Sequence, residues 1–217
     1  MNDSDKFQQF IMEWGRDNCR EFPWRMPDIT PYESIVAEML LRRTRAETVK
    51  KMYSGFIVRY PDFISLSRAP ISDLQELLRP IGFAKVRSNA FKVLASTIIK
   101  DHNGFLPEDE TYISNLPHCG RYTANAVLCF SFGQQRAIVD APIHRMMYRH
   151  MGFQPVREIH KADELWEFMA HLVPKASPRE FNYSLLDYCA IICTPKACKC
   201  SIPVIGEGAD WSSIRNG

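Results

Sequence analysis

The chain has 217 residues, enough for one or two domains with a substantial buried core. Hydrophobic residues make up 46% and charged residues 24%, and no apolar run reaches the roughly 18–20 residues that cross a membrane, which excludes a transmembrane helix. A net charge of +2 is too small to establish a polyanionic partner. The first residues, MNDSDKFQQF, lack the apolar core of a signal peptide, so we expect a protein of the cytoplasm (nucleoid) or nucleus.

Apolar residues at helical spacing predict a succession of α-helices. Phe22-Pro23-Trp24-Arg25 is expected to be a connector, because Pro23 breaks a helix. Thr30 is a suitable N-cap and Pro31 a suitable first residue for the helix that follows. Further helices are expected at 6–17, 47–59, 71–78, 85–100, 110–115, 122–132, 161–173 and 180–192, and another begins at Asp140. The chain has no alternating strand pattern, so we predict an all-α fold.

Basic residues concentrate in the stretch Leu41–Lys51, LRRTRAETVKK, which holds five basic residues and one acid. Lys85 and Arg87 form a smaller basic group. A basic face suits the phosphate backbone of a nucleic acid, but a solvated helix face has the same composition. Charge alone therefore leaves both interpretations open.

A tight hairpin, Leu116-Pro117-His118-Cys119-Gly120, separates a short predicted helix from a longer one. Such a turn places backbone N–H groups at the N-terminus of the second helix, where the helix dipole also favours an anion. The hairpin therefore predicts a phosphate contact that fixes a nucleic acid without reading its sequence.

Two carboxylates are candidates for chemistry. Asp140 follows Gly120 by twenty residues and heads the next helix, where it could serve only as an N-cap. Glu38 lies beside an apolar helix stripe, where it either makes a structural hydrogen bond at the rim of the core or takes part in catalysis.

Four of the seven cysteines, Cys189, Cys193, Cys198 and Cys200, fall within twelve positions. In an intracellular protein such crowding indicates metal or iron–sulfur ligation before disulfides.

The stretch LPHCGRYTANAV, followed by FGQQRAIVDAPIHR, resembles the helix-hairpin-helix DNA glycosylases of the endonuclease III/MutY superfamily. The family signature is a hairpin of the form LPGVGxxTAxAV and an aspartate in VDxxxxR, which match Leu116–Val127 and Val139–Arg145 here. The segments FPWR, PYESIVAEMLLRRT and IGFAKVRSNA are also similar, so the resemblance extends to about residue 193.

The resemblance implies two helical lobes with a DNA-binding cleft between them, into which one nucleotide is flipped. A six-helix lobe that contains the hairpin would cover residues 27–134. Residues 1–26 and 135–205 would form the second lobe, and 206–217 a tail. The implied partner is double-stranded DNA with a mismatched or damaged base, bound by a monomer without a membrane.

The resemblance also assigns catalytic roles to Asp140, Tyr122 and Glu38. The Asp140 carboxylate would stabilise positive charge that develops on the sugar and orient the attacking water. Relatives with lyase activity carry lysine at the position of Tyr122, where the amine forms a Schiff base that tyrosine cannot form. This implies a monofunctional glycosylase that leaves an abasic site. Glu38 would contact the base or act as an acid.

The same resemblance implies a set of DNA contacts. Arg43 and Phe83 occupy positions from which relatives insert side chains into the base stack, although Phe83 could instead pack in the core. The remaining expected contacts are Arg42, Lys85, His118, Gly120 and Arg121.

We predict thymine (or uracil) opposite guanine as the substrate. The segment EMLLRRT matches the thymine branch, whereas the adenine branch usually reads EVMLQQT. Adenine glycosylases usually carry a further C-terminal domain, for which a chain that ends at residue 217 has no room. The alternatives are an adenine glycosylase acting opposite guanine or 8-oxoguanine, and a catalytically inactive DNA-binding relative.

The chain departs from the family pattern at three places. His118 and Cys119 replace a glycine and a valine of the hairpin, and Pro142 stands where mismatch branches usually carry an asparagine that helps to hold the aspartate. The cysteines also depart, since relatives bind a [4Fe–4S] cluster through C-x6-C-x2-C-x5-C. Here the spacing is Cys193-x4-Cys198-x-Cys200. Cys189 is a candidate fourth ligand, because Cys189 and Cys193 would be i and i+4 on one face of a helix. A cluster and a degenerate remnant without one are both open, and the chemistry itself requires no cofactor.

Overall fold

The computed structural model describes residues 3–201 of the chain. Within that range the regular structure is helical, and the isolated bridge between Cys193 and Cys198 belongs to no strand. The predicted all-α class is confirmed. The expected tail 206–217 and the last residues of the expected second lobe, 202–205, lie outside the described part of the chain. No helix among the described residues is long and apolar enough to span a bilayer.

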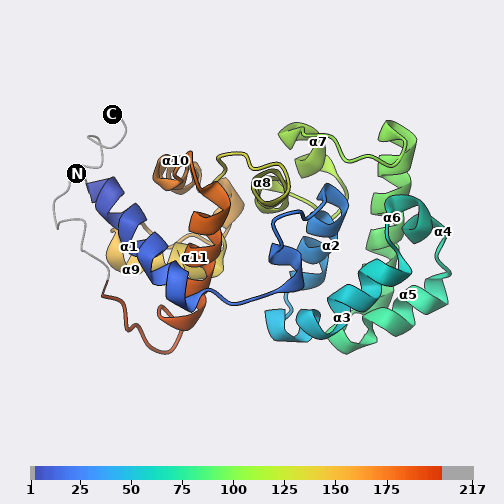
Figure 1. Cartoon of the computed structure of the whole chain (residues 1–217), viewed down its shortest axis with the longest axis horizontal. Helices are drawn as coiled ribbons and strands as arrows, with labels where there is room; N and C mark the ends of the chain where they lie inside the picture. The colour runs from blue at the N-terminus through green and yellow to red at the C-terminus, as the bar shows by residue number, and fades with distance from the viewer. Residues whose placement is uncertain (1–2, 202–217) are drawn as a thin grey trace. The chain divides into compact units, whose positions relative to one another are not determined.

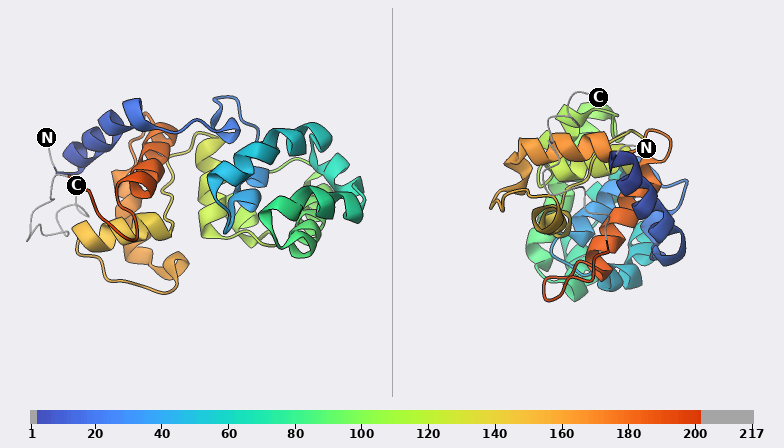
Figure 2. Two further views of the ribbon diagram at one scale, coloured as in Figure 1. Left: turned by 90° about the horizontal axis from the view of Figure 1, so that it is seen from below. Right: turned by 90° about the vertical axis from the view of Figure 1, so that its left-hand side faces the viewer.

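The chain forms two compact units, which we describe separately. One is the continuous segment Glu21–Phe132, which we call the central unit. The other combines the two ends of the described chain, residues 3–20 and 133–201, and we call it the terminal unit. Figures 1 and 2 show both units coloured along the chain.

The central unit packs its helices around a core of fully buried side chains such as Ile35, Phe56 and Phe91. Helix α6 packs against α4 and α5, and α8 packs against α2 and α7. The elements are η1 Pro23–Arg25, α2 Pro31–Leu41, α3 Ala46–Arg59, α4 Phe63–Arg68, α5 Ile71–Leu78, η2 Arg79–Ile81, α6 Ala84–His102, α7 Glu110–Asn115 and α8 Arg121–Phe130.

The predicted start of α2 is confirmed by a capping box. The Thr30 hydroxyl accepts a hydrogen bond from the Glu33 N–H at 3.2 Å, and the Glu33 carboxylate accepts one from the Thr30 N–H at 2.8 Å. The connector before α2 is the short 3-10 turn η1, anchored by the stacked rings of Phe22 and Trp24, whose centroids are 4.7 Å apart. These contacts fix the entry to α2, the helix that carries Glu38.

The terminal unit pairs α1 with α11, two helices from opposite ends of the chain that lie side by side in Figures 1 and 2. They pack tightly at Gly15, where an added Cβ would lie 1.9 Å from the Ser184 hydroxyl oxygen, so a side chain cannot fit. The elements are α1 Asp3–Asn18, α9 Ala141–His150, η3 Ile159–Lys161, α10 Asp163–Leu172 and α11 Pro178–Ile191.

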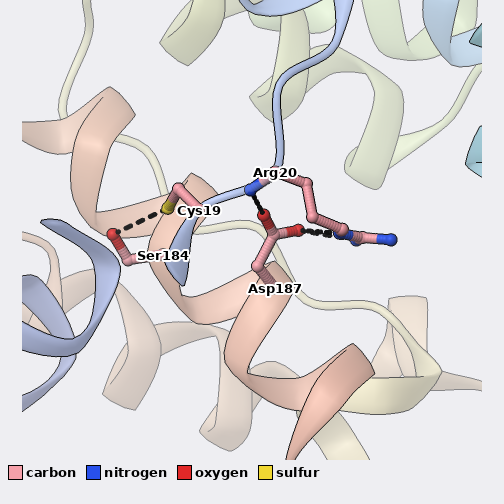
Figure 3. A network of polar contacts seen from close by, with 4 residues as sticks. All are labelled: Cys19, Arg20, Ser184 and Asp187. Carbon is pink, nitrogen blue, oxygen red and sulfur yellow. Dashed lines mark hydrogen bonds and ion pairs between the residues drawn. The ribbon is translucent and has the colours of Figure 1, made fainter. Parts of the chain in front are cut away.

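A buried carboxylate fixes the end of α1 to α11, as Figure 3 shows. Asp187, whose side chain is fully buried, accepts the Arg20 backbone N–H at 2.7 Å. It also accepts the Arg20 Nε at 2.9 Å and Nη2 at 2.6 Å. A buried carboxylate is costly unless it is paired, so this three-bond contact makes the junction specific.

Candidate functional site

The hairpin Leu116–Gly120 joins α7 to α8 and is anchored by the buried side chain of Leu116. Its Cys119 N–H donates to the Leu116 carbonyl at 3.0 Å. His118, which replaces the family glycine, has φ 64°, the left-handed region that favours glycine. The histidine therefore adopts a backbone conformation that suits glycine, which costs strain, and its side chain is exposed.

A residue of α2 and the residue that follows the helix both act on this hairpin. The Arg42 guanidinium donates to the His118 carbonyl, and the charges of Arg42 and Glu38 both act on the Cys119 thiol. Burial raises the pKa of Cys119 to about 12, with Arg42 lowering it and Glu38 raising it. Cys119 is therefore a neutral thiol near neutral pH and packs against the core as the family valine would.

Glu38 is a buried residue of α2, with 6% of its surface exposed. Its charge acts on the hairpin thiol, so it lies toward the same end of the central unit as the turn. Tyr122 is the second residue of α8 and is half-buried. The structure thus gathers the hairpin, Glu38 and Arg42, and it sets Tyr122 in the helix turn that directly follows.

Asp140 is the N-cap of α9, as predicted, and its Oδ1 accepts the Ile143 N–H at 2.8 Å. Burial raises the pKa of Asp140 to about 6, while that hydrogen bond and the charge of Arg145 lower it. Pro142 lies in the first turn of α9 and has no N–H to offer the carboxylate. The cap through Ile143 holds Asp140 without help from the side chain at position 142.

Four expected DNA-contacting residues, Arg42, Arg43, Phe83 and His118, line one hollow of the central unit. Phe83 is 71% exposed, which contradicts the alternative that it packs in the core. Arg43 and Phe83 both have positive φ values, 54° and 51°, so two strained turns hold these side chains at the surface. Lys85, also expected to contact DNA, is exposed nearby on the first turn of α6.

Arg87 is not part of an exposed basic group with Lys85. Its guanidinium donates to the carbonyls of Met39 at 2.8 Å, Arg42 at 2.6 Å and Gly82 at 3.1 Å. Burial, and then the charge of Arg42, lowers the pKa of Arg87. The side chain caps the C-terminal end of α2 and connects it to the turn before Phe83. The sequence did not reveal this role of Arg87.

The structure brings together three of the four expected metal ligands. Cys193, Cys198 and Cys200 converge, but the fourth member of the group is His150, and all four ligand atoms lie within 4.8 Å of one another. Cys189 is fully buried and its Sγ lies 3.5 Å from the Met146 Sδ. Helix α11 ends at Ile191, so Cys193 lies beyond the helix that carries Cys189.

The chain is similar to known DNA repair proteins. The profile of the HhH-GPD superfamily of base excision DNA repair proteins matches residues 36–171. The thymine/uracil-DNA glycosylase of Methanothermobacter thermautotrophicus is 40% identical over 89% of this chain and 87% of its own length. The adenine DNA glycosylase of Mycobacterium tuberculosis is 26% identical over 95% of this chain and 66% of its own length.

A solved structure of a thermostable thymine-DNA glycosylase superposes on this chain with a TM-score of 0.87. The two sequences are 35% identical, and the match covers 93% of each chain.

Proposed function

The chain belongs to the HhH-GPD superfamily of base excision DNA repair proteins, and we propose that it is a monofunctional glycosylase for thymine or uracil opposite guanine. The observation that carries the substrate assignment is its 40% identity to a thymine/uracil-DNA glycosylase over most of both lengths. The adenine relative is less similar, at 26% identity. The proposal also includes double-stranded DNA as the partner and a monomer as the active form.

DNA docking in this proposal uses the hairpin and the hollow of the central unit. The first turn of a helix offers N–H groups that no residue within the helix accepts, and the start of α8 would present them to a phosphate. Gly120 and Arg121 begin that helix, and His118 and Lys85 add exposed basic or polar side chains. Such contacts position the duplex and carry no sequence preference.

In this proposal Arg43 and Phe83 distort the DNA by inserting into the base stack. An exposed aromatic ring on a rigid turn suits insertion between bases, and a guanidinium suits hydrogen bonding to the base left opposite. Flipping the mismatched nucleotide costs less than flipping a paired one, so a mismatch is favoured before chemistry begins.

The chemical step in this proposal depends on Asp140. Cleavage of the N-glycosidic bond leaves positive charge on the sugar, which an ionised carboxylate stabilises while it orients water. The raised pKa of Asp140 means that the carboxylate is ionised at pH 7 and above but is close to its titration range. The base departs with the bonding electrons, and Glu38 is proposed to contact or protonate it.

The lack of lyase activity in this proposal follows from Tyr122. A phenol cannot form the imine that an amine forms with the opened sugar, so the reaction stops at an abasic site. The DNA strand is then broken only when alkali is added.

The proposal is tested with four labelled duplexes that contain T·G, U·G, A·G or A·8-oxoG pairs, each analysed with and without alkali. We expect strand breaks from T·G and U·G, and only after alkali. Product from A·8-oxoG alone would overturn the substrate assignment. Binding of all four duplexes without any product would indicate an inactive relative.

A further inference from the structure

We propose that His150, Cys193, Cys198 and Cys200 bind a single tetrahedral metal ion, with Zn²⁺ the best fit, where the family resemblance implies an iron–sulfur cluster. The inference concerns the terminal unit alone and does not depend on which base the enzyme removes. Three thiolates and one imidazole are a common ligand set of structural zinc sites.

The separations between the ligand atoms fit one ion. Zn–S bonds of about 2.3 Å place tetrahedral ligands about 3.8 Å apart. The four ligand atoms here lie within 4.8 Å of one another, and the His150 Nε2 is 3.0 Å from the Cys198 Sγ. Sub-ångström side-chain adjustments therefore bring all four onto one centre.

A four-iron cluster does not fit the same residues. Each thiolate of such a cluster binds a different iron, so its ligands must surround a whole cube rather than one ion. The group offers three cysteines, and Cys189, the remaining candidate, has its Sγ 3.5 Å from Met146 in the core. Cys189 is not among the residues whose ligand atoms lie within 4.8 Å of one another, so that group lacks the fourth thiolate of a cluster.

The loop that carries the cysteines is held in shape by its own hydrogen bonds. The Thr194 hydroxyl donates to the Ala197 carbonyl at 2.8 Å, and the Lys199 N–H donates to the Ile192 carbonyl at 3.1 Å. Cys193 and Cys198 also form a bridge between the two arms of the loop. The ligands are thus arranged by the backbone before any ion binds.

Two arginines of α9 provide the surroundings that a thiolate site needs. Arg149 donates from Nη1 to the Thr194 carbonyl at 2.7 Å and lies 3.7 Å from the Cys193 Sγ. Arg145 donates from Nε to the Cys193 carbonyl at 3.0 Å. Binding releases the thiol protons and leaves Zn²⁺ with three thiolates at a net charge of −1, which the adjacent Arg149 cation offsets.

The proposed ion would connect this loop to the catalytic helix. Helix α9 begins directly after Asp140 and ends at His150, so the ion would join the C-terminal end of α9 to the loop after α11. Its role would be structural, because the ligand His150 lies a whole helix away from the Asp140 carboxylate. The ion would hold α9, and with it the N-cap position of Asp140, in one orientation.

The test begins with the purified full-length protein. Elemental analysis should find one zinc per chain and no iron, without acid-labile sulfide. X-ray absorption should give three sulfur neighbours at about 2.3 Å and one nitrogen at about 2.0–2.1 Å. Iron with sulfide and broad visible absorbance, or an apoprotein that binds no zinc in equilibrium dialysis, would overturn the proposal.

Variants then identify the ligands. His150→Gln should lower zinc affinity by more than tenfold, since even an outer-shell change typically costs roughly 10–100-fold. Cys189→Ala and the exposed His160→Gln are matched controls that should keep full zinc content. His150→Cys keeps a donor atom and should retain zinc even if His150→Gln fails to fold. Zinc that survives His150→Gln, or is lost in Cys189→Ala, would contradict the assignment.

Discussion

Replacing Arg87 by lysine tests how the central unit holds its two candidate DNA-inserting turns. The guanidinium fork reaches three backbone carbonyls, those of Met39, Arg42 and Gly82, and also the Thr44 hydroxyl at 2.9 Å. These acceptors come from the end of α2, the turn after it and the turn before α6, and a single ammonium cannot reach them all. Arg87→Lys should therefore release at least two of the four contacts.

The expected loss of stability follows from those contacts. Each hydrogen bond contributes a net of about 1 kcal/mol, so losing two or three of them should cost about 2–3 kcal/mol. For a chain of this size, 1 kcal/mol corresponds to roughly 2–4 °C in Tm, so Arg87→Lys should melt roughly 4–12 °C lower. Thermal unfolding followed by circular dichroism measures this difference.

Lys85→Ala is the matched control, because Lys85 is an exposed cation on the same helix. It should leave Tm unchanged and weaken DNA binding with a reduced salt dependence, as expected for a lost phosphate contact. Arg87→Lys should instead reduce the binding preference for mismatched over paired DNA, since the turns that carry Arg43 and Phe83 would be held less firmly. An Arg87→Lys protein with the wild-type Tm would refute the reasoning.

Three further predictions concern the candidate site. Because the pKa of Asp140 is raised to about 6, the single-turnover rate should be independent of pH above pH 7 and fall about tenfold per pH unit below pH 6. A rate that rises on acidification would exclude an ionised carboxylate as the active form. Tyr122→Lys should gain strand cleavage without alkali and a borohydride-trappable DNA adduct, and the absence of both would argue against this position facing the sugar. His118→Gly should relieve a positive φ and raise the unfolding free energy in urea by up to about 1 kcal/mol, whereas a less stable protein would show that the histidine side chain itself stabilises the turn.

Local signals in the sequence predicted most of the helices. Thr30, Pro31 and Asp140 act at helix N-termini in the roles expected from their residue types, because capping depends on neighbours within one turn. Helix α4 was missed, because its start depends on a capping box between Asp62 and Ser65 rather than on a repeated spacing of apolar residues.

Contacts between distant residues could not be predicted in the same way. His150 reaches Cys198 across 48 positions, and Arg87 reaches the Met39 carbonyl across the same number. The sequence instead suggested Cys189, because its spacing from Cys193 would match one face of a helix if α11 continued. The helix ends at Ile191, one residue before its predicted end, so Cys193 lies beyond it.

The proposed chemistry depends most on the carboxylate of Asp140, and Asp140→Asn tests its role directly. Asparagine is an equally good N-cap, so α9 should keep its start. Because burial raises the pKa of Asp140 from 3.8 to about 6, the ionised group destabilises the fold as pH rises through that window. Removing the charge should therefore stabilise the protein at neutral pH, by at most about 3 kcal/mol.

The decisive measurement is the single-turnover rate of Asp140→Asn on a T·G duplex, together with its affinity for that duplex. Removing one group that stabilises transition-state charge typically lowers the rate by about 10²–10³-fold, and we predict at least that loss. Affinity should stay within a few-fold of the wild type. A rate within tenfold of the wild type, from a folded variant that binds T·G normally, would contradict the central role of Asp140.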